Sequence, residues 1–227
     1  FFKQKTAYEI KECDWSSDVC SSDLRCPAAR PRVVPGPARW PNNSGGSRSV
    51  WRRCVRRLPA DWATRDALEV APDLLGRLIV VGDVLARVVE VEAYTADDPA
   101  SHSFRGPTRR AASMFLEGGC WYVYLIYGVH LCLNLVTGHE GDGQAVLIRS
   151  VLVDGVDAAR TTGPGRLTAT LGIGRELDGA AASLFDDGWS PDRPATVSTR
   201  IGISKGTDLL RRWSLIDGGG AVRRARA

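Results

Sequence analysis

Two glutamates stand two residues apart in the run VVEVEAY, residues 88–94. Side chains alternate between the faces of an extended strand, so Glu90, Glu92 and Tyr94 share one face and Val89 lies on the other with the remaining apolar residues. A strand carboxylate can simply be solvated. In a site that excludes bulk water it can instead take a proton from a water molecule and stabilise positive charge that develops nearby. The run alone leaves both interpretations open.

A loop with a compact basic group follows this strand. Its sequence is DDPASHSFRGPTRR, residues 97–110, and it brings Thr108, Arg109 and Arg110 together shortly after His102. Arginine side chains, hydroxyl groups and backbone N–H groups are the donors that proteins use to contact phosphates. The loop therefore favours contact with a nucleic-acid backbone, with an ordinary solvated loop as the alternative.

Aromatic residues recur in the next apolar run, WYVYLIYGVHLCLN, residues 121–134. Tyrosines in strands commonly pack in a core or against a neighbouring strand. Tyr127 precedes Gly128, where a hairpin would turn, and a side chain at a turn is harder to bury. The position of Tyr127 favours a ring that projects beyond the sheet.

These residues require a scaffold of short strands. Thr64 is predicted to cap a helix whose apolar residues recur at helical spacing between 67 and 75, before Gly76. Strands joined by tight turns are predicted over 78–81, 84–94, 121–127, 131–137 and 145–153. The expected fold class is α+β, a single domain built on a mainly antiparallel, curved β-sheet with a protruding β-hairpin and flanking helices.

The net charge of +4 is distributed unevenly. Residues 1–57 carry 12 Lys and Arg against 5 Asp and Glu, whereas residues 58–227 carry 18 against 21. DNA binding by the second part would therefore depend on a local basic face. Residues 1–57 are interpreted as a disordered or artefactual tail, residues 58–218 as the folded domain, and residues 219–227 as a disordered basic tail.

Metal, membrane and export signals are weak. Six cysteines without a CxxC pair and three histidines at irregular spacing predict no metal site, and we expect no cofactor. The longest uncharged apolar stretch, residues 118–137, is interrupted by Gly, Asn and aromatic residues, so no membrane span is expected. Without a signal-peptide pattern, the expected location is the cytoplasm, in association with the nucleoid.

The chain resembles the alkyladenine (3-methyladenine) DNA glycosylase family in four runs that follow the family's order. These are VVEVEAYTADDPASHSF, MFLEGGCWYVYLIYGVHLCLN, GDGQAVLIR and TGPGRLTATLGI. Together with ISKGTDLLRRW they extend roughly from Leu58 to Trp213. Each run alone is a weak signal, whereas four in order are a strong one. The segment WSLIDGGGAVRRARA departs from the family pattern, in which a closing strand stands at this place.

The resemblance implies a role for individual residues. Glu92 would be the general base, Arg149 would hold and orient the attacking water, and the backbone carbonyl of Ile201 would be the water's third partner. The residues implied around an extruded base are Tyr94, His102 and Tyr124, with Asn134 beside it. The residues implied in DNA contact are Tyr127, which would enter the duplex, and Thr108, Arg109, Arg110, Val129 and His130.

The function implied by this resemblance is monofunctional base excision. The enzyme would flip an alkylated or deaminated purine out of double-stranded DNA, hydrolyse its N-glycosidic bond and leave an abasic site, acting as a monomer. A lyase mechanism usually needs an amine nucleophile, and residues 58–227 contain one lysine, Lys205.

Two other classes of function stay open at this point. A non-catalytic module that binds damaged DNA would share the aromatic hairpin and the basic loop, but it would not need Glu92 and Arg149 together. A metal-dependent hydrolase could use Glu90, Glu92 and His102, but it lacks a convincing third and fourth ligand.

Overall fold

The computed structural model describes residues 55–126 and 128–215. The predicted tails at 1–54 and 219–227 lie outside these ranges. Residues 55–57, which the sequence placed in the N-terminal tail, are described, and β1 (Arg56–Arg57) pairs with β7 (Leu184–Asp186). The described structure therefore begins ahead of Leu58.

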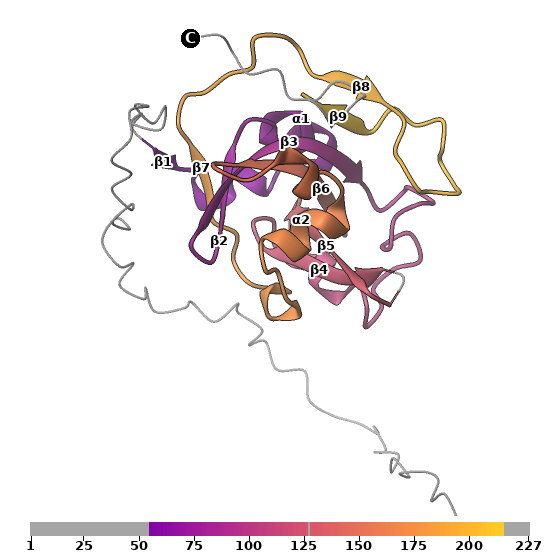
Figure 1. Cartoon of the computed structure of the whole chain (residues 1–227). Coiled ribbons are helices and arrows are strands. Elements are labelled where there is room, and N and C mark those ends of the chain that lie inside the picture. The colour runs from indigo at the N-terminus through magenta and orange to yellow at the C-terminus, as the bar shows by residue number, and fades with distance from the viewer. Residues whose placement is uncertain (1–54, 127, 216–227) are drawn as a thin grey trace, which may run out of the picture. The chain divides into compact units, whose positions relative to one another are not determined.

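A mainly antiparallel sheet organises the described residues, in the strand order β1-β7-β2-β3-β6-β5-β4, with β9 paired to β3 and to β8 (Figure 1). Its further strands are β2 (Leu78–Val81), β3 (Val84–Tyr94), β4 (Trp121–Ile126), β5 (His130–Thr137), β6 (Gln144–Val153), β8 (Thr196–Ser198) and β9 (Arg212–Ser214). The α-helices are α1 (Ala67–Leu74) and α2 (Pro164–Thr170), and single 3₁₀ turns occur at Ala60–Ala63, Ala112–Phe115, Ala158–Arg160 and Arg175–Leu177. The expected α+β class and the main predicted strands are confirmed.

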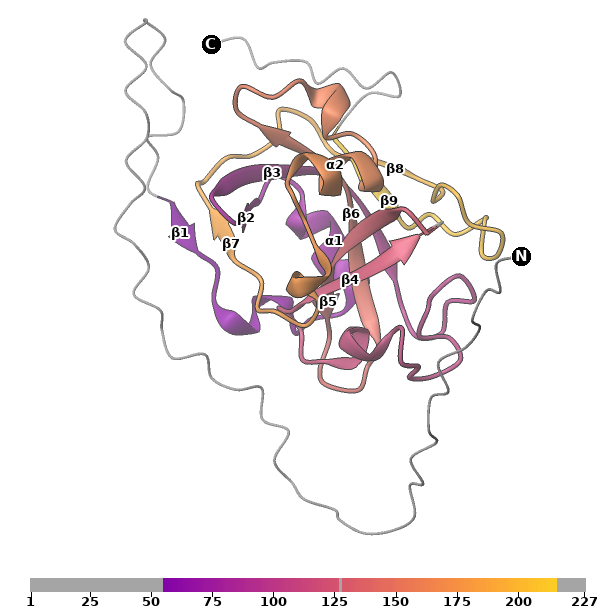
Figure 2. The same cartoon turned by 60° about the horizontal axis from the view of Figure 1, so that its bottom comes forward.

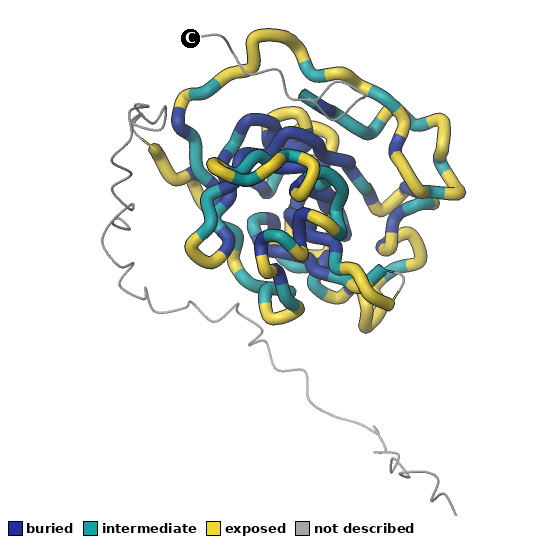
Figure 3. The backbone as a smooth tube through the Cα atoms, in the orientation of Figure 1, coloured by how far each residue is buried: buried dark blue, intermediate teal, exposed yellow. Residues whose placement is uncertain are grey.

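One face of the sheet carries the main apolar core. Both α-helices contribute buried residues to it, among them Leu74 from α1 and Leu167 from α2, and they meet Val91, Ile148 and Leu133 of three adjacent strands. Figure 2 shows α1 among these strands, and Figure 3 shows that the buried segments are concentrated there, whereas the connection between β8 and β9 is largely exposed. The opposite face is therefore available for polar residues of β3.

The start of α1 differs from the prediction. Asp66, not Thr64, is the N-cap, and its side chain accepts a hydrogen bond from the backbone N–H of Leu68 at 2.8 Å. Thr64 ends the preceding 3₁₀ turn, and its hydroxyl donates to the carbonyl of Asp61. Thr and Asp are both favourable N-cap residues, so the residue types alone do not decide between them. The helix begins at Ala67, which makes Asp66 the cap.

The alternation of β3 is interrupted once. Val88 faces Val151 of β6 and Glu90 faces Ser150, so Val89 is an extra residue in β3. The next pair is shifted the other way, which leaves Arg149 as an extra residue in β6. As a result Val88, and not Val89 as predicted, joins the main core with the apolar residues that follow. Bulges of this kind redirect side chains, often beside active sites.

The last strand of the described residues is β9. β9 pairs with β3 through Glu90, Val91 and Glu92, and the N–H of Leu215 donates to the carbonyl of Val89. Trp213 packs against the main core. β9 therefore includes only Trp213 and Ser214 of the segment that departs from the family pattern, and residues 216–227 of that segment lie outside the described residues. Among the described residues, no helix has the length and apolar character needed to cross a membrane.

Candidate active site

The site is built across four neighbouring strands. Glu92 of β3 lies opposite Leu147 of β6, which lies opposite Asn134 of β5, which lies opposite Tyr122 of β4. Residues directly opposite each other in an antiparallel sheet project from the same face. This row therefore carries Glu92 and the predicted pocket residue Asn134 on the face opposite the main core.

Glu92 is fully buried, and three donors surround its carboxylate. The backbone N–H of Ile201 donates to Oε1 at 2.9 Å, Nη1 of Arg149 lies 3.2 Å from the same oxygen, and the hydroxyl of Tyr94 donates to Oε2 at 2.9 Å. Burying a charged carboxylate is costly unless such partners replace its water. The arrangement excludes the solvated-strand interpretation of Glu92.

Glu90 is also held by several partners. Its Oε1 accepts hydrogen bonds from Nε of Arg149 at 3.2 Å and from Nη1 of Arg212 at 2.9 Å, and its Oε2 accepts from the hydroxyl of Ser150 at 2.9 Å. One guanidinium, that of Arg149, thus bridges both glutamates. Glu90 therefore fixes the side chain that contacts Glu92.

The backbone explains how Arg149 reaches both carboxylates. Because Arg149 is the extra residue of β6, its carbonyl is free of the β3 ladder and accepts a hydrogen bond from the N–H of Gly163 at 2.8 Å. Gly163 has φ of +98°, a conformation that a residue with a side chain rarely adopts, and it precedes α2. The glycine of the TGPG run therefore supports the bulge that directs Arg149 to the site.

An aromatic cluster lies beside this carboxylate pair. Nδ1 of His102 is 2.8 Å from the hydroxyl of Tyr122, and the His102 ring meets the Tyr124 ring edge to face with centroids 4.5 Å apart. Desolvation and the nearby guanidinium of Arg110 lower the pKa of His102, which favours the neutral imidazole at neutral pH. A neutral ring can stack on a base without adding charge.

The tyrosines of the site stay protonated at neutral pH. Burial, followed by the charge of Glu92 and the hydrogen bond to it, raises the pKa of Tyr94 far above its usual value. Burial likewise raises the pKa of Tyr124. Tyr94 is therefore a hydrogen-bond donor to Glu92 and not a competing anion.

Comparisons of the sequence with known proteins identify its family. A family model described as Methylpurine-DNA glycosylase (MPG) matches residues 61–218. The chain belongs to this family. A 3-methyladenine DNA glycosylase, so named, from Methanoculleus marisnigri is 44% identical over 183 residues, which cover 70% of this chain and 94% of that protein. Proteins of the same name from Burkholderia lata and Cutibacterium acnes are 41% and 40% identical, covering 70% and 65% of this chain and 87% and 90% of theirs.

The family resemblance drawn from the sequence is thereby confirmed. This chain is a DNA glycosylase of base excision repair, a hydrolase of N-glycosyl bonds whose substrate is DNA. Of the site residues that the resemblance implied, the structure brings Glu92, Arg149, Tyr94 and Ile201 into direct contact. For Ile201 the observed contact is made by the N–H group, whereas the predicted partner of the water is the carbonyl.

Four of the implied DNA-contact residues of the glycosylase lie on exposed loops. Thr108, Arg109 and Arg110 are exposed, and Arg110 donates to the carbonyl of Leu125 while its guanidinium lies over the Tyr124 ring, 5.5 Å from the centroid. The basic loop is thereby tied to the β4–β5 hairpin. Val129 at that hairpin is 72% exposed.

The remaining predicted site residues are His130, Asn134 and Tyr127. His130 is exposed, and its ring lies close to Gly165 at the start of α2. Asn134 is buried, and its Nδ2 donates to the carbonyls of Tyr122 and Cys132. Tyr127 lies outside the described residues.

Sequence reasoning missed several partners in the glycosylase site. Arg212 and Ser150 were not considered, and Glu90 was not expected to hold Arg149. A signal for Glu90 was present, because it shares the strand face of Glu92 two residues away. No pattern in the sequence of β3 predicts the contact with Arg212, which lies 122 positions from Glu90 in the sequence.

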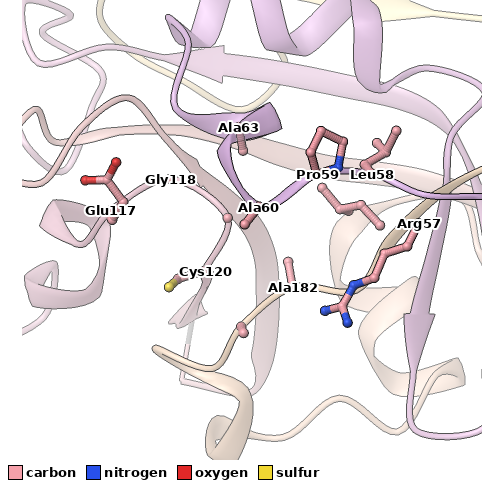
Figure 4. A pocket seen from close by; sticks show the side chains of 12 residues that line it. Arg57, Leu58, Pro59, Ala60, Ala63, Glu117, Gly118, Cys120 and Ala182 are labelled. Carbon is pink, nitrogen blue, oxygen red and sulfur yellow. The ribbon is translucent and has the colours of Figure 1, made fainter. Parts of the chain in front are cut away.

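A pocket of about 560 Å³ lies elsewhere on the glycosylase. Small and apolar residues line most of it, and Figure 4 shows Arg57 and Glu117 on its opposite sides. The carboxylate of Glu117 already accepts hydrogen bonds from the N–H of Glu140 and lies 3.2 Å from His139. None of the predicted catalytic residues lines this pocket. Within residues 55–126 and 128–215, no group of three metal-binding side chains occurs.

Proposed function

We propose that this glycosylase removes alkylated or deaminated purines from duplex DNA by hydrolysis, with Glu92 as the general base. The observation that carries the proposal is a fully buried carboxylate with a guanidinium, a hydroxyl and a backbone N–H around it. A carboxylate kept in such a site can accept a proton and stabilise positive charge on the sugar.

The proposed reaction balances simply. A water oxygen forms a bond to C1′, its proton passes to Glu92, the C1′–N9 bond breaks, and the bonding electron pair leaves with the purine. Arg149 and the carbonyl of Ile201 are the proposed further partners of the water. Because Lys205 is the one lysine after residue 57, a Schiff-base step is disfavoured and the product is an abasic site in an intact strand.

The aromatic cluster suits the proposed substrates. Alkylation at N3 or N7 makes a purine cationic and a better leaving group, and aromatic faces attract cations as well as stacking on neutral bases. Tyr94, His102 and Tyr124 are the proposed walls for the extruded base, with Asn134 beside it. A base must be flipped to reach such a pocket, and a damaged base is the least costly to flip.

The remaining expectations complete the proposal. Thr108, Arg109, Arg110, Val129 and His130 are proposed to contact the DNA around the extruded base. All five are exposed, and Arg110 lies over the Tyr124 ring of the aromatic cluster. We further propose that the enzyme acts as a monomer, in the cytoplasm and on nucleoid DNA.

The experiment uses four duplexes that differ at one position. They carry 3-methyladenine, hypoxanthine, 1,N⁶-ethenoadenine or adenine, and sites are counted by alkaline cleavage after incubation with the protein. Alkali-labile sites should form at lesions and not at adenine, with or without a strong chelator. Absence of sites at every lesion would contradict the proposed function. Activity lost with chelator and restored by zinc would favour the metal-dependent hydrolase.

Tyr127→Ser should slow base release from duplex DNA more than from single-stranded DNA. The proposed role of Tyr127 is to fill the gap left by the flipped nucleotide, and single-stranded DNA has no such gap to fill. The measurement is the ratio of single-turnover rates on the two forms of one lesion oligonucleotide. Equal slowing on both forms would contradict the proposed role.

A further inference from the structure

A second buried ion pair lies behind the active site. The side chains of Arg200 and Asp98 are both fully buried, and the guanidinium contacts both carboxylate oxygens, one of them from Nη2 at 3.0 Å. Nη1 of Arg200 also donates to the carbonyl of Ala93 at 3.0 Å. The planar guanidinium thus binds both oxygens of the Asp98 carboxylate and the Ala93 carbonyl at the same time, an arrangement of donors that a lysine side chain lacks.

This pair joins three separate segments of the chain. Ala93 belongs to the end of β3. Asp98 opens the loop that carries His102, and its Oδ1 accepts from the N–H of Ala100 at 2.9 Å while its carbonyl accepts from the N–H of Ser101. Arg200 belongs to the connection between β8 and β9. The pair therefore fixes that connection against β3 and the His102 loop.

Arg200 is adjacent to two of the groups that contact Glu92. Its guanidinium lies over the Tyr94 ring, 4.6 Å from the centroid, and the Tyr94 hydroxyl donates to Oε2 of Glu92. The next residue, Ile201, donates its N–H to Oε1. A displacement of Arg200 would therefore move a donor on each oxygen of the carboxylate. Arg149 contacts Glu92 from a different segment, β6.

We propose that Arg200, held by Asp98, is a positioning residue for base release, acting on Glu92 through Tyr94 and Ile201. The inference rests on the proposed role of Glu92. Catalytic groups must be held within about half an ångström of productive geometry, and misplacement of about 1 Å can cost about a hundredfold in rate. The pair does not touch the reacting atoms, so its effect reaches them only through the two donors.

The chain contains a matched control for this pair. Arg87 and Asp187 are also buried, with Nη2 of Arg87 2.6 Å from the carboxylate. Nη1 of Arg87 donates to the carbonyl of Gly76 at 2.6 Å, and the guanidinium lies over the Trp189 ring at 4.8 Å. Both are buried arginine–aspartate pairs with an aromatic ring against the guanidinium, although Asp98 also lies 3.4 Å from Nη1 of a second arginine, Arg211. None of these contacts of Arg87 involves Glu92 or its donors. A substitution in the Arg87 pair therefore measures how much the loss of a buried ion pair alone changes stability and rate.

The experiment compares Arg200→Lys with Arg87→Lys in the full chain. Urea unfolding curves first identify conditions in which each variant is folded. Under those conditions we would measure the affinity for a lesion duplex and the single-turnover rate of base release at saturating protein. Arg200→Lys should release base about tenfold or more slowly with affinity within about threefold, whereas Arg87→Lys should match the parent rate. Should Arg200→Lys fail to fold, Asp98→Asn and Asp187→Asn make the comparison, with Arg211→Lys as the control for the second arginine that contacts Asp98.

Two results separate this inference from the proposed function. If the parent protein releases no base, the proposed function fails. If the parent is active and the two substitutions leave the same rate per folded molecule, or slow it equally, then Arg200 has a structural role and the positioning inference is overturned.

Discussion

Glu92→Gln should lower single-turnover base release by about 10²–10⁴-fold while binding of lesion DNA is retained. The substitution keeps the size of the side chain and one acceptor oxygen. That oxygen can still accept from the N–H of Ile201 and from Arg149, while the Tyr94 hydroxyl can turn to accept from the new amide. The fold should therefore survive, and only the charge and basicity are removed.

The measurement for this prediction is release and affinity on one lesion duplex. Glu69→Gln, on the exposed side of α1, should match the parent in both. Glu90→Gln should fall between the two, because Glu90 holds Arg149 and does not contact the proposed water. A Glu92→Gln protein that turned over within about threefold of the parent would show that the carboxylate is not the general base.

Arg149→Met should both destabilise the protein and slow base release. Arg149 bridges Glu90 and Glu92, and removing one partner of a buried ion pair typically costs about 3–5 kcal/mol of unfolding free energy. Glu90 keeps Arg212 and Ser150, so most of the cost should fall on Glu92. Release should slow by about ten- to a hundredfold, because an unheld carboxylate loses its orientation.

Urea unfolding and single-turnover release at a folded condition give both parts of this prediction. Arg65→Met is the control, since Arg65 pairs with Asp73 at 2.7 Å on the surface, where such pairs contribute about 0–1 kcal/mol. Arg149→Lys should lie between the parent and Arg149→Met, because lysine keeps the charge but cannot bridge two carboxylates. Equal stability of Arg149→Met and Arg65→Met would contradict the bridging role.

Local patterns predicted the parts of the fold that local sequence controls. The alternation of apolar residues and the Gly82-Asp83 turn identify the β2–β3 hairpin, which the structure confirms. The bulge at Val89 was not predictable in the same way, because it depends on the partner strand and not on β3 itself. The same holds for Arg149, whose placement needs the N–H of Gly163 from another segment.

The residues of the site also differ in how far the sequence predicted them. Glu92 was identified because the resemblance covers its whole strand, whereas the partners that surround its buried carboxylate include Ile201 and Arg149 from other segments. The Asp98–Arg200 pair joins residues 102 positions apart, and no periodicity in either segment points to the other. Side chains that hold a catalytic group are drawn from distant segments because the site lies where those segments meet. Sequence reasoning therefore identified Glu92 and its direct partners, and it missed the residues that hold those partners, Glu90, Arg212 and Arg200.

Binding of a lesion should lead to hydrolysis of its glycosidic bond at Glu92. The most direct test measures bound duplex, free base and strand breaks in one sample at saturating protein. We expect a duplex with hypoxanthine or 3-methyladenine to release its base in proportion to the bound fraction, and its strand to stay intact until alkali is added. Lesion DNA recovered from the complex with its base still attached would contradict catalysis at Glu92, and a strand cut before alkali would contradict the hydrolytic mechanism.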